Sequence, residues 1–237
     1  MEKKSSYTYK YPHPSVTTDC VIFGFDGKDL NILLVERGLE PFKGAWALPG
    51  GFLKMDETVE ECAKRELQEE TNVSNVFLEQ FHIFSAVDRD PRERVLTVAF
   101  YALVKPSDYE VIGGDDASQA EWFEQNELPP LAFDHEEVIN MAKECLKEKL
   151  RTKPIAFKLL NDKFSMTELQ TLYEVILDTK YDRRNFYRKA LSSGFLSEEG
   201  VSEKVQASRR TNLYSFDEKL FEESEDSQPT GKFPFDF

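Results

Sequence analysis

Residues 50–73, with the sequence GGFLKMDETVEECAKRELQEETNV, concentrate seven acidic side chains and Arg65 in a segment that has the apolar spacing of a helix. At about 100° per residue, the apolar residues of this segment form one stripe, which we expect to be buried. Glu66 and Glu70 fall in the middle of that stripe, and Glu69 falls at its edge. These carboxylates are therefore predicted to point inward and not to form a solvated face.

Inward-pointing carboxylates need compensation, because burial penalises their charged forms and close carboxylates raise one another's pKa. Arg65 could serve one of them, and a hard divalent cation such as Mg²⁺ could serve the group. Just upstream, Gly50 and Gly51 carry no Cβ and would let a ligand approach the backbone closely. The combination of loop, helix and converging carboxylates predicts metal-assisted phosphate chemistry.

These residues carry a resemblance to a known family. The spacing resembles the Nudix box, G-x5-E-x7-R-E-U-x-E-E-x-G-U, where U is a bulky aliphatic residue. The matching positions are Gly51, Glu57, Arg65, Glu66, Leu67, Glu69, Glu70 and Val73.

The resemblance implies an α/β/α sandwich and a role for each acidic residue. Glu66, Glu69 and Glu70 would bind metal, with Glu57 and Arg65 supporting them as the catalytic group of a hydrolase. The one departure is Asn72, where the family has glycine. Asn is the residue that best tolerates the left-handed conformation after glycine, so the change affects backbone geometry more than the metal ligands.

The elements that must position this helix can be predicted from the pattern around it. Residues 19–25 and 30–37 flank the turn signal DGKD and predict paired strands. RVLTVAFYALV, residues 94–104, is typical of a central strand. A helix is expected over residues 133–150, with Asp134 as its N-cap. We therefore expect one α/β domain over residues 1–150.

A second module is predicted after Pro154, which cannot continue the preceding helix. Ser165 and Glu168 form a capping box before a strongly periodic helix, and a second helix follows from Asp182 to Gly194. Two β-like pieces, GVSEKVQ and RRTNLYSF, complete the outline of an α+β winged helix-turn-helix domain over residues 151–216. Residues 217–237, rich in Glu, Asp and Ser, are expected to form an extended acidic tail.

The second predicted helix of this module, DRRNFYRKALSS, has one basic and amide face. On a helical wheel, Phe186 and Ala190 lie on the packed side and the basic residues lie opposite. Arg and Asn side chains are well shaped for base edges in the major groove, and other basic residues suit phosphates. The predicted base-reading face consists of Arg184, Asn185, Arg188 and Lys189, and the predicted phosphate contacts are Arg183, Lys204, Arg209 and Arg210.

The distribution of charge agrees with this division of labour. The chain carries a net charge of −14, which by itself argues against a nucleic-acid partner. Residues 151–216, however, contain 12 basic and 8 acidic side chains, whereas residues 1–150 contain 16 and 29. A basic module therefore follows an acidic body.

The combination of a Nudix domain with this module resembles the Nudix-related transcription regulators. Segments that carry the match include DRDPRERVLTVAFYALV, LAFDHEEVI and DRRNFYRKALSSGFL. The resemblance implies a homodimer that binds double-stranded operator DNA and a small-molecule effector. That effector is either an ADP-ribose-like nucleotide or a sugar such as L-arabinose. In this group the Nudix fold often lacks hydrolase activity, so no cofactor is required.

The alternative is a Mg²⁺-dependent Nudix hydrolase acting on a nucleoside diphosphate derivative such as ADP-ribose. The nearly intact acidic box favours the hydrolase, and the basic helix face favours the regulator, because hydrolysis does not need such a face. In either case, a phosphorylated ligand would need positive charge near Gly50 and Gly51. Candidate residues for this charge are Arg89, Arg92 and Arg94, although a polar loop explains them equally well.

The remaining signals bear on location. No segment approaches the roughly 18 apolar residues needed to span a bilayer, and the three cysteines show neither metal-ligand nor CxxC spacing. We therefore expect a cytoplasmic protein with no membrane partner. His13, His82 and His135 are isolated in sequence and are predicted to be structural.

Overall fold

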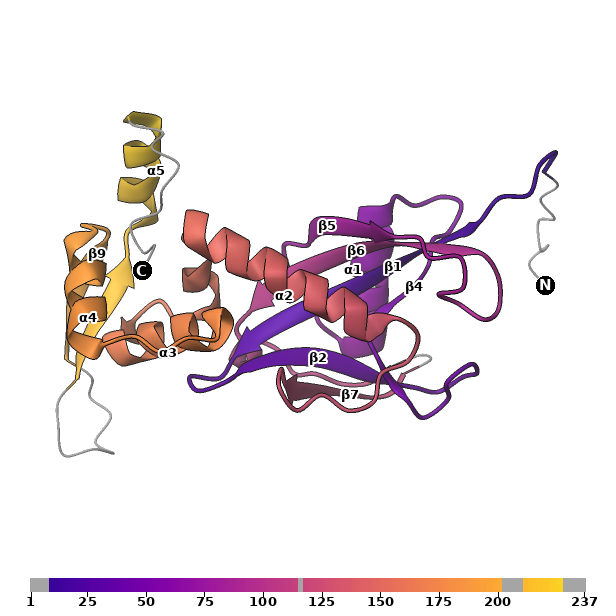
Figure 1. The fold of residues 1–237 in the computed structure, drawn as a ribbon, viewed down its shortest axis with the longest axis horizontal. Coiled ribbons are helices and arrows are strands. Elements are labelled where there is room, and N and C mark those ends of the chain that lie inside the picture. Colours follow the sequence, from indigo (N-terminus) through magenta and orange to yellow (C-terminus); the bar gives the residue numbers. More distant parts are fainter. Residues whose placement is uncertain (1–8, 115–116, 202–210, 228–237) are drawn as a thin grey trace.

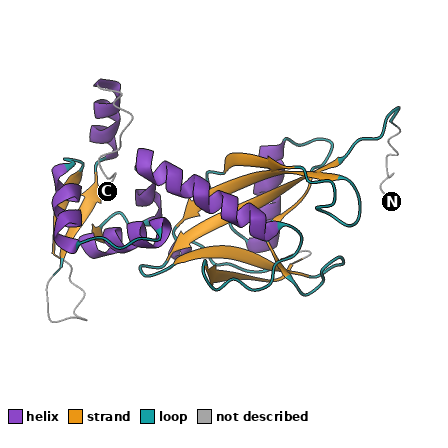
Figure 2. Ribbon diagram, viewed as in Figure 1, coloured by secondary structure: helices purple, strands orange, loops and turns teal. Residues whose placement is uncertain are grey.

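The computed structural model describes residues 9–114, 117–201 and 211–227. These residues form an α/β body and, at the other end of the molecule, a smaller group of helices with a short sheet (Figures 1 and 2). Among them, no helix combines the length and the apolar character that crossing a bilayer requires.

A seven-stranded sheet forms the centre of the body. Its main path runs β3-β2-β1-β6-β5, while β4 pairs with β1 and β7 pairs with β2. Its central pair, β1 and β6, is parallel. The strands are β1 (Ser15–Phe25), β2 (Leu30–Arg37), β3 (Trp46–Ala47), β4 (Gly50–Phe52), β5 (Glu79–Phe84), β6 (Val95–Val104) and β7 (Ala117–Glu124).

Two helices cover opposite faces of this sheet, α1 (Val59–Thr71) and α2 (His135–Thr152) (Figure 1). The central strand β1 is buried on both sides, and its second half, CVIFGF, is therefore almost entirely apolar. Because successive side chains of a strand alternate, Val21 and Phe23 join the core under α2, and Cys20 and Ile22 join the core under α1. The predicted α/β/α sandwich is confirmed.

The C-terminal module has the predicted winged-helix outline. The short 3₁₀ helix η2 (Ile155–Leu159) follows α2 and leads into this module. Another 3₁₀ helix, η1 (Pro106–Asp108), belongs to the body, where it follows β6. The helices of the module are α3 (Met166–Leu177) and α4 (Arg183–Ser192). Its three-stranded sheet has the order β8-β10-β9, made of β8 (Phe164–Ser165), β9 (Leu196–Val201) and β10 (Asn212–Phe216).

The helix starts of this module follow the sequence signals. At α3, the Ser165 hydroxyl accepts from the Glu168 amide at 3.1 Å, and the Glu168 carboxylate accepts from the Ser165 amide at 2.7 Å. At α4, Asp182 accepts from the Asn185 amide at 2.9 Å. Both predicted N-caps are confirmed, because each cap satisfies donors that the first helical turn leaves unpaired.

The prediction of an extended tail is wrong for residues 218–227, which form helix α5 (Glu218–Ser227). Asp217 accepts from the Leu220 amide at 3.0 Å and so caps the first turn. Phe221 lies 5.4 Å from Phe195 and 6.0 Å from Phe216, measured between ring centroids. Aromatic packing onto the winged helix therefore offsets the polar composition of the segment. The predicted tail also includes residues 228–237, which lie outside the described residues.

Candidate functional site

Helix α1 carries the acidic cluster, and its ends show why the sequence forms a helix there. Thr58 and Glu61 make a capping box at the start. At the end, Asn72 adopts φ 61°, a left-handed conformation, so asparagine does occupy the position where the Nudix pattern has glycine. The substitution at Asn72 thus keeps the helix end that glycine would make.

Arg65 is the centre of the acidic cluster and contacts three carboxylates. Its guanidinium donates to both oxygens of Glu57, at 2.6 and 2.9 Å. It also donates to Glu66 at 2.6 Å and to Glu69 at 3.0 Å. These contacts lower the pKa of Glu57 to about 2, with the Arg65 hydrogen bonds as the largest cause. Arg65 was expected to serve one carboxylate, and the structure gives it three.

Glu66 and Glu70 point toward the glycine loop of β4. Burial raises the pKa of Glu66 above its ordinary value even though Arg65 opposes the shift. Glu70 accepts a hydrogen bond from the Gly50 amide at 2.9 Å. A Cβ at Gly51 would overlap the Glu66 carboxyl group, and one at Gly50 would overlap the Thr18 carbonyl. Gly50 is therefore required by the close approach of β4 to the backbone of β1, and Gly51 leaves room for the Glu66 carboxyl group.

The predicted metal ligands do not converge as one set. Glu66 and Glu70 line a cavity, but Glu69 is 38% exposed and turned onto Arg65. Among the described residues, no three His, Cys, Asp or Glu side chains are placed to hold a metal ion. Carboxylate oxygens suit Mg²⁺ chemically, yet the arrangement does not fit the three-carboxylate magnesium site expected from the sequence.

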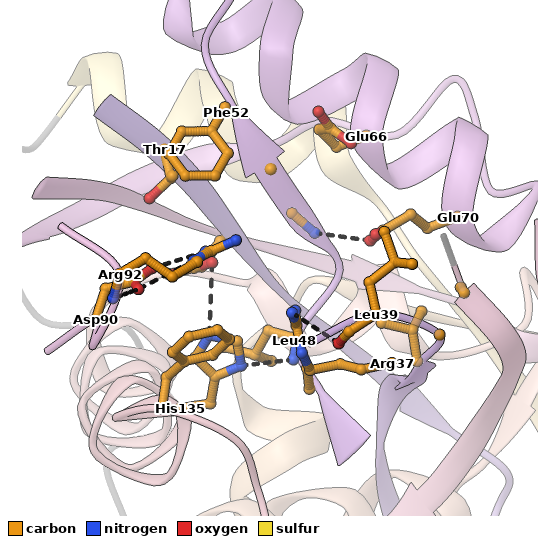
Figure 3. A pocket seen from close by; sticks show the side chains of 18 of the residues that line it. Thr17, Arg37, Leu39, Leu48, Phe52, Glu66, Glu70, Asp90, Arg92 and His135 are labelled. Carbon is orange, nitrogen blue, oxygen red and sulfur yellow. Dashed lines mark hydrogen bonds and ion pairs between the residues drawn. The ribbon is translucent and has the colours of Figure 1, made fainter. Parts of the chain in front are cut away.

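The cavity lies between the glycine loop, the end of β2, the 89–92 turn and the start of α2 (Figure 3). Its volume is about 440 Å³, within the range of pockets that hold small molecules. Of the predicted ligand residues, Gly50, Gly51, Arg89 and Arg92 line it. Arg94 does not. It donates to the carbonyl oxygens of Ser85, Ala86 and Val95 and so holds the turn.

Arg89 forms a buried ion-pair network below the cavity. Its guanidinium donates to Asp134 at 2.7 and 2.9 Å and to Asp19 at 3.1 Å. Its side chain is only 5% exposed, and buried arginines require such partners. Asp134 was predicted to cap α2, but its side chain makes no capping hydrogen bond because both its oxygens bind Arg89. The network fixes the start of α2 against β1.

His135, the first residue of α2, lies in the cavity wall (Figure 3) and next in sequence to Asp134 of this network. Its Nδ1 accepts from the Leu48 amide at 2.8 Å, so Nε2 carries the proton of the neutral ring. Burial lowers the pKa of His135, which favours this neutral form. Its predicted structural role is therefore incomplete, because the imidazole is also part of the cavity surface.

Phe133 forms an aromatic platform at the side of the cavity. The Arg37 guanidinium lies 4.8 Å from its ring centroid, and the Arg92 guanidinium lies 5.7 Å away. Phe133 and its neighbour Phe42 both have positive φ, 53° and 64°, and their rings are 4.9 Å apart. Such conformations are strained for bulky residues and concentrate at functional sites. Arg92 is also held by Asp90, at 2.7 and 3.0 Å.

Sequence reasoning missed several cavity residues: Thr17, Asp19, Arg37, Asp90, Phe133 and His135. They come from separate strands and turns, and no spacing relates them. The sequence FDH, residues 133–135, combines an aromatic, an acidic and an imidazole side chain. Nothing in the sequence indicates which distant residues these side chains contact, so their place in the cavity could not be predicted.

A second candidate site is the exposed face of α4, at the end of the molecule away from α1 (Figure 1). Arg183, Arg184, Asn185 and Arg188 are exposed, and Lys189 is half-buried. Asn185 accepts from Arg188 at 3.0 Å, so the amide and one guanidinium already lie side by side. On the opposite side Phe186 is buried against Tyr173. The predicted contacts Lys204, Arg209 and Arg210 lie outside the described residues.

Comparison with known proteins gives matches along both parts of the chain. A NUDIX domain model matches residues 13–142. A model of the NrtR DNA-binding winged helix domain matches residues 156–216.

Two curated relatives match different lengths of the chain. The ADPR responsive transcriptional repressor NtrR of Acinetobacter baylyi is 36% identical over 209 residues, covering 87% of this chain and 83% of the relative. The ADP-ribose pyrophosphatase of Methanocaldococcus jannaschii is 44% identical over 140 residues, covering 59% of this chain and 79% of the relative.

A solved structure extends the likeness to both parts. Shewanella oneidensis NrtR in complex with a 27mer DNA has a TM-score of 0.69 and 30% identity, covering 85% of this chain and 93% of that one. The NUDIX domain of the same protein, in a cocrystal structure with ADP ribose, has a TM-score of 0.54 and 35% identity, covering 59% and 94%.

Proposed function

Because this chain belongs to the Nudix family and carries a winged helix domain of the NrtR type, we propose that it is a transcriptional repressor whose operator binding responds to ADP-ribose. The observation that carries the proposal is the match to an ADP-ribose-responsive repressor along 87% of the chain. That match includes both the part with the cavity and the part with the basic helix. We assign the effector to the part before residue 150 and the operator to residues 151–216.

The cavity offers chemistry suited to each part of ADP-ribose. The Phe133 ring is an aromatic surface on which a base could stack. Arg37 and Arg92 supply guanidinium groups, which match the geometry of phosphates. Glu66 and Glu70 are acceptors for ribose hydroxyl groups. In this proposal the carboxylates bind sugar and need no metal ion, which agrees with the engagement of Glu57, Glu66 and Glu69 by Arg65.

The basic face of α4 is proposed to enter the major groove. Arg184, Asn185 and Arg188 would contact base edges, and Arg183 would contact the phosphate backbone. We also propose that two copies of the chain bind one operator, since winged and related helix-turn-helix modules read paired half-sites as dimers. Light scattering of the purified chain would measure this assembly, and a monomeric mass on operator DNA would contradict it. Such a repressor would act in the cytoplasm.

ADP-ribose can regulate DNA binding only if it binds the DNA-competent and DNA-incompetent arrangements with different affinity. A tenfold change in operator affinity corresponds to about 1.4 kcal/mol of coupling. ADP-ribose and operator must then change each other's affinity by the same factor, because the linkage is reciprocal.

The test uses the full chain, ADP-ribose and a labelled duplex that the protein itself selects from a random-sequence pool. We expect Arg184→Ala together with Arg188→Ala to weaken duplex binding at least about thirtyfold, from about 1–3 kcal/mol for each lost contact. Calorimetric affinity for ADP-ribose should stay unchanged. Lys28→Ala, which removes one exposed positive charge of the Nudix part, serves as the control for charge loss away from α4.

Two results would contradict the proposal: wild-type duplex binding that ignores ADP-ribose, or the double variant binding the duplex as tightly as Lys28→Ala does.

A second candidate function is Mg²⁺-dependent hydrolysis of ADP-ribose. The identity of 44% with an ADP-ribose pyrophosphatase, over the part that contains the acidic helix, favours it. The site residues would be Glu57, Arg65, Glu66, Glu69 and Glu70. Release of AMP and ribose 5-phosphate on incubation with Mg²⁺, abolished by Glu70→Gln, would support this function. Intact ADP-ribose recovered after prolonged incubation would exclude it.

A further inference from the structure

Gln125 joins the two parts of the chain by a buried hydrogen bond. It follows β7, in the part that matches the Nudix domain, and it is 8% exposed. Its Nε2 donates to the carbonyl oxygen of Val175 at 2.9 Å. Val175 lies in the last turn of α3, where the helix leaves carbonyls without intrahelical donors. A side chain of the Nudix part thus satisfies the end of a winged-helix element.

The backbone of Gln125 holds two further elements. Its amide donates to the Leu30 carbonyl at the start of β2, at 2.9 Å. Its carbonyl accepts from the Lys143 ammonium of α2, at 3.5 Å. One residue therefore connects β2, α2 and α3, in addition to ending β7.

Each of the Nudix elements held by Gln125 reaches the cavity at its far end. Strand β2 ends with Arg37 in the cavity wall, about 24 Å from Leu30 at ~3.4 Å per residue. Strand β7 begins there with Ala117, and α2 begins there with His135. In Figure 1, α2 visibly spans from the body to the winged helix. A ligand that moves the cavity wall therefore acts on elements that converge at Gln125.

On the other side, α3 holds the basic helix α4. The rings of Tyr173 and Phe186 meet edge to face at 5.8 Å. Thr167 and Tyr187 share a hydrogen bond of 2.9 Å between their hydroxyl groups. A shift of α3 therefore carries α4 with it, because the two helices share a packed and hydrogen-bonded interface.

A second polar contact also joins the two parts but differs in its surroundings. The Lys105 ammonium lies 2.9 Å from the Asp162 carboxylate, and Asp162 is 96% exposed. Water and salt screen such a pair, so it fixes little. The Gln125 bond is buried and directional, and its loss would leave the Val175 carbonyl without its donor. Of these two polar contacts, the Gln125 hydrogen bond is therefore the one that can hold α3 in a defined position.

We propose that Gln125 is the positioning residue that transmits occupancy of the cavity to α3 and, through α3, to the DNA-binding face of α4. The proposal rests on the proposed function, because it takes ADP-ribose as the cavity ligand. Gln125 itself contacts neither ADP-ribose nor DNA. Its role is to add a directional hydrogen bond between β2, β7 and α2 on one side and α3 on the other, in addition to the apolar core that they share.

Hydrogen exchange of the full chain, with and without ADP-ribose, tests this role. In the wild type, ADP-ribose should change amide exchange near the cavity and also in α3 and α4. Gln125→Met keeps the length and volume of the side chain and removes the donor, and Gln125→Asn keeps the amide but shortens its reach. Both variants should retain ADP-ribose affinity within about twofold while losing most of the response in α4. Asp162→Asn should respond like the wild type.

The outcomes separate the two proposals. No ADP-ribose binding by the wild type would overturn the proposed function. ADP-ribose binding with an unchanged α4 response in both Gln125 variants would overturn the positioning role and leave the proposed function standing. A fall in melting temperature together with lost ADP-ribose affinity in both variants would mark Gln125 as merely structural, and so would also overturn the role.

Discussion

At the scale of single residues, Arg65 sets the positions and the electrostatic surroundings of the carboxylates at the acidic helix α1. Its single guanidinium holds three carboxylates in a small region and offsets one of their three negative charges. Glu57 is the most strongly affected of these groups, since both its oxygens accept from Arg65. Arg65 therefore holds Glu57, Glu66 and Glu69 together at the surface of α1.

The pH dependence of stability follows from Glu57. Its folded pKa of about 2 is below the ordinary value of 4.5, so its stabilisation is complete above pH 4.5 and is lost as the pH falls toward 2. Near neutral pH, Glu57→Gln should lower the free energy of unfolding by about 2 kcal/mol, as for hydrogen bonds to charged groups.

Urea denaturation of wild type and Glu57→Gln between pH 6 and 2 measures this contribution. The difference between the two proteins should shrink steadily below pH 4.5. A difference that stays constant down to pH 2 would contradict the depressed pKa of Glu57.

The strained platform residue Phe133 gives a second prediction. Asparagine tolerates left-handed φ better than phenylalanine does, so Phe133→Asn relieves about 1 kcal/mol of strain and loses about as much in aromatic contacts. The free energy of unfolding should change by less than about 1 kcal/mol. ADP-ribose affinity should fall about tenfold, because the stacking surface is gone.

Phe133→Tyr, which keeps the ring, is the matched control and should bind ADP-ribose nearly as the wild type does. Calorimetric titration of the two variants decides the matter. Equal affinity in Phe133→Asn and Phe133→Tyr would remove Phe133 from the proposed binding surface.

The sequence predicted some site residues and not others for a physical reason. The inward orientation of Glu66 and Glu70 could be predicted because helical periodicity relates residues within one element. The network of Asp19, Arg89 and Asp134 was not, because its members come from a strand, a turn and a helix start that meet only after folding. Even Asp134, correctly placed before α2, turned its side chain to a partner 45 residues away in sequence.

At the scale of elements, α3 holds a central position between the sheet and α4. Its capping box satisfies two backbone donors at its start, and Gln125 satisfies a carbonyl at its end. Both ends are thus polar and fixed, while Leu169, Leu172 and Tyr173 are fully buried between them. The register of α3 against its neighbours depends on these few contacts.

Removal of the α3 cap should therefore have a local cost. Ser165→Ala should reduce the free energy of unfolding by about 1 kcal/mol, typical of a lost N-cap, and Ser165→Thr, which keeps the hydroxyl, should lose less. Denaturation with urea compares the two. A loss in Ser165→Thr as large as that in Ser165→Ala would show that burial, and not the cap, dominates at this position.

Element boundaries were predictable where local signals agree, as at Ser165 and Asp182. Helix α5 was not, because the acidic composition of residues 217–227 favours solvation, and the decisive contacts of Phe221 are with distant rings. The family model of the winged helix ends at residue 216, so α5 extends that module.

At the scale of the whole molecule, the hydrophobic core is continuous between the two parts. One cluster of buried residues runs from the sheet, through α2, to α3 and α4. Modules that share a core lose it together, so the chain should unfold in one transition. Differential scanning calorimetry should give a single peak with equal calorimetric and van't Hoff enthalpies, shifted upward as a unit by ADP-ribose. Two separable peaks would contradict this coupling.

The placement of α4 at one end of an acidic molecule also affects how the protein distributes between its operator, random DNA and the unbound state. The exposed basic face of α4 attracts the DNA backbone, whereas the chain as a whole, with a net charge of −14, is repelled by it. A repressor of the proposed kind would therefore leave random DNA readily and keep a large unbound population. Unbound protein can bind the effector without first leaving DNA. The speed of the response would therefore depend on the distribution of charge along the molecule, because that distribution sets the size of the unbound population.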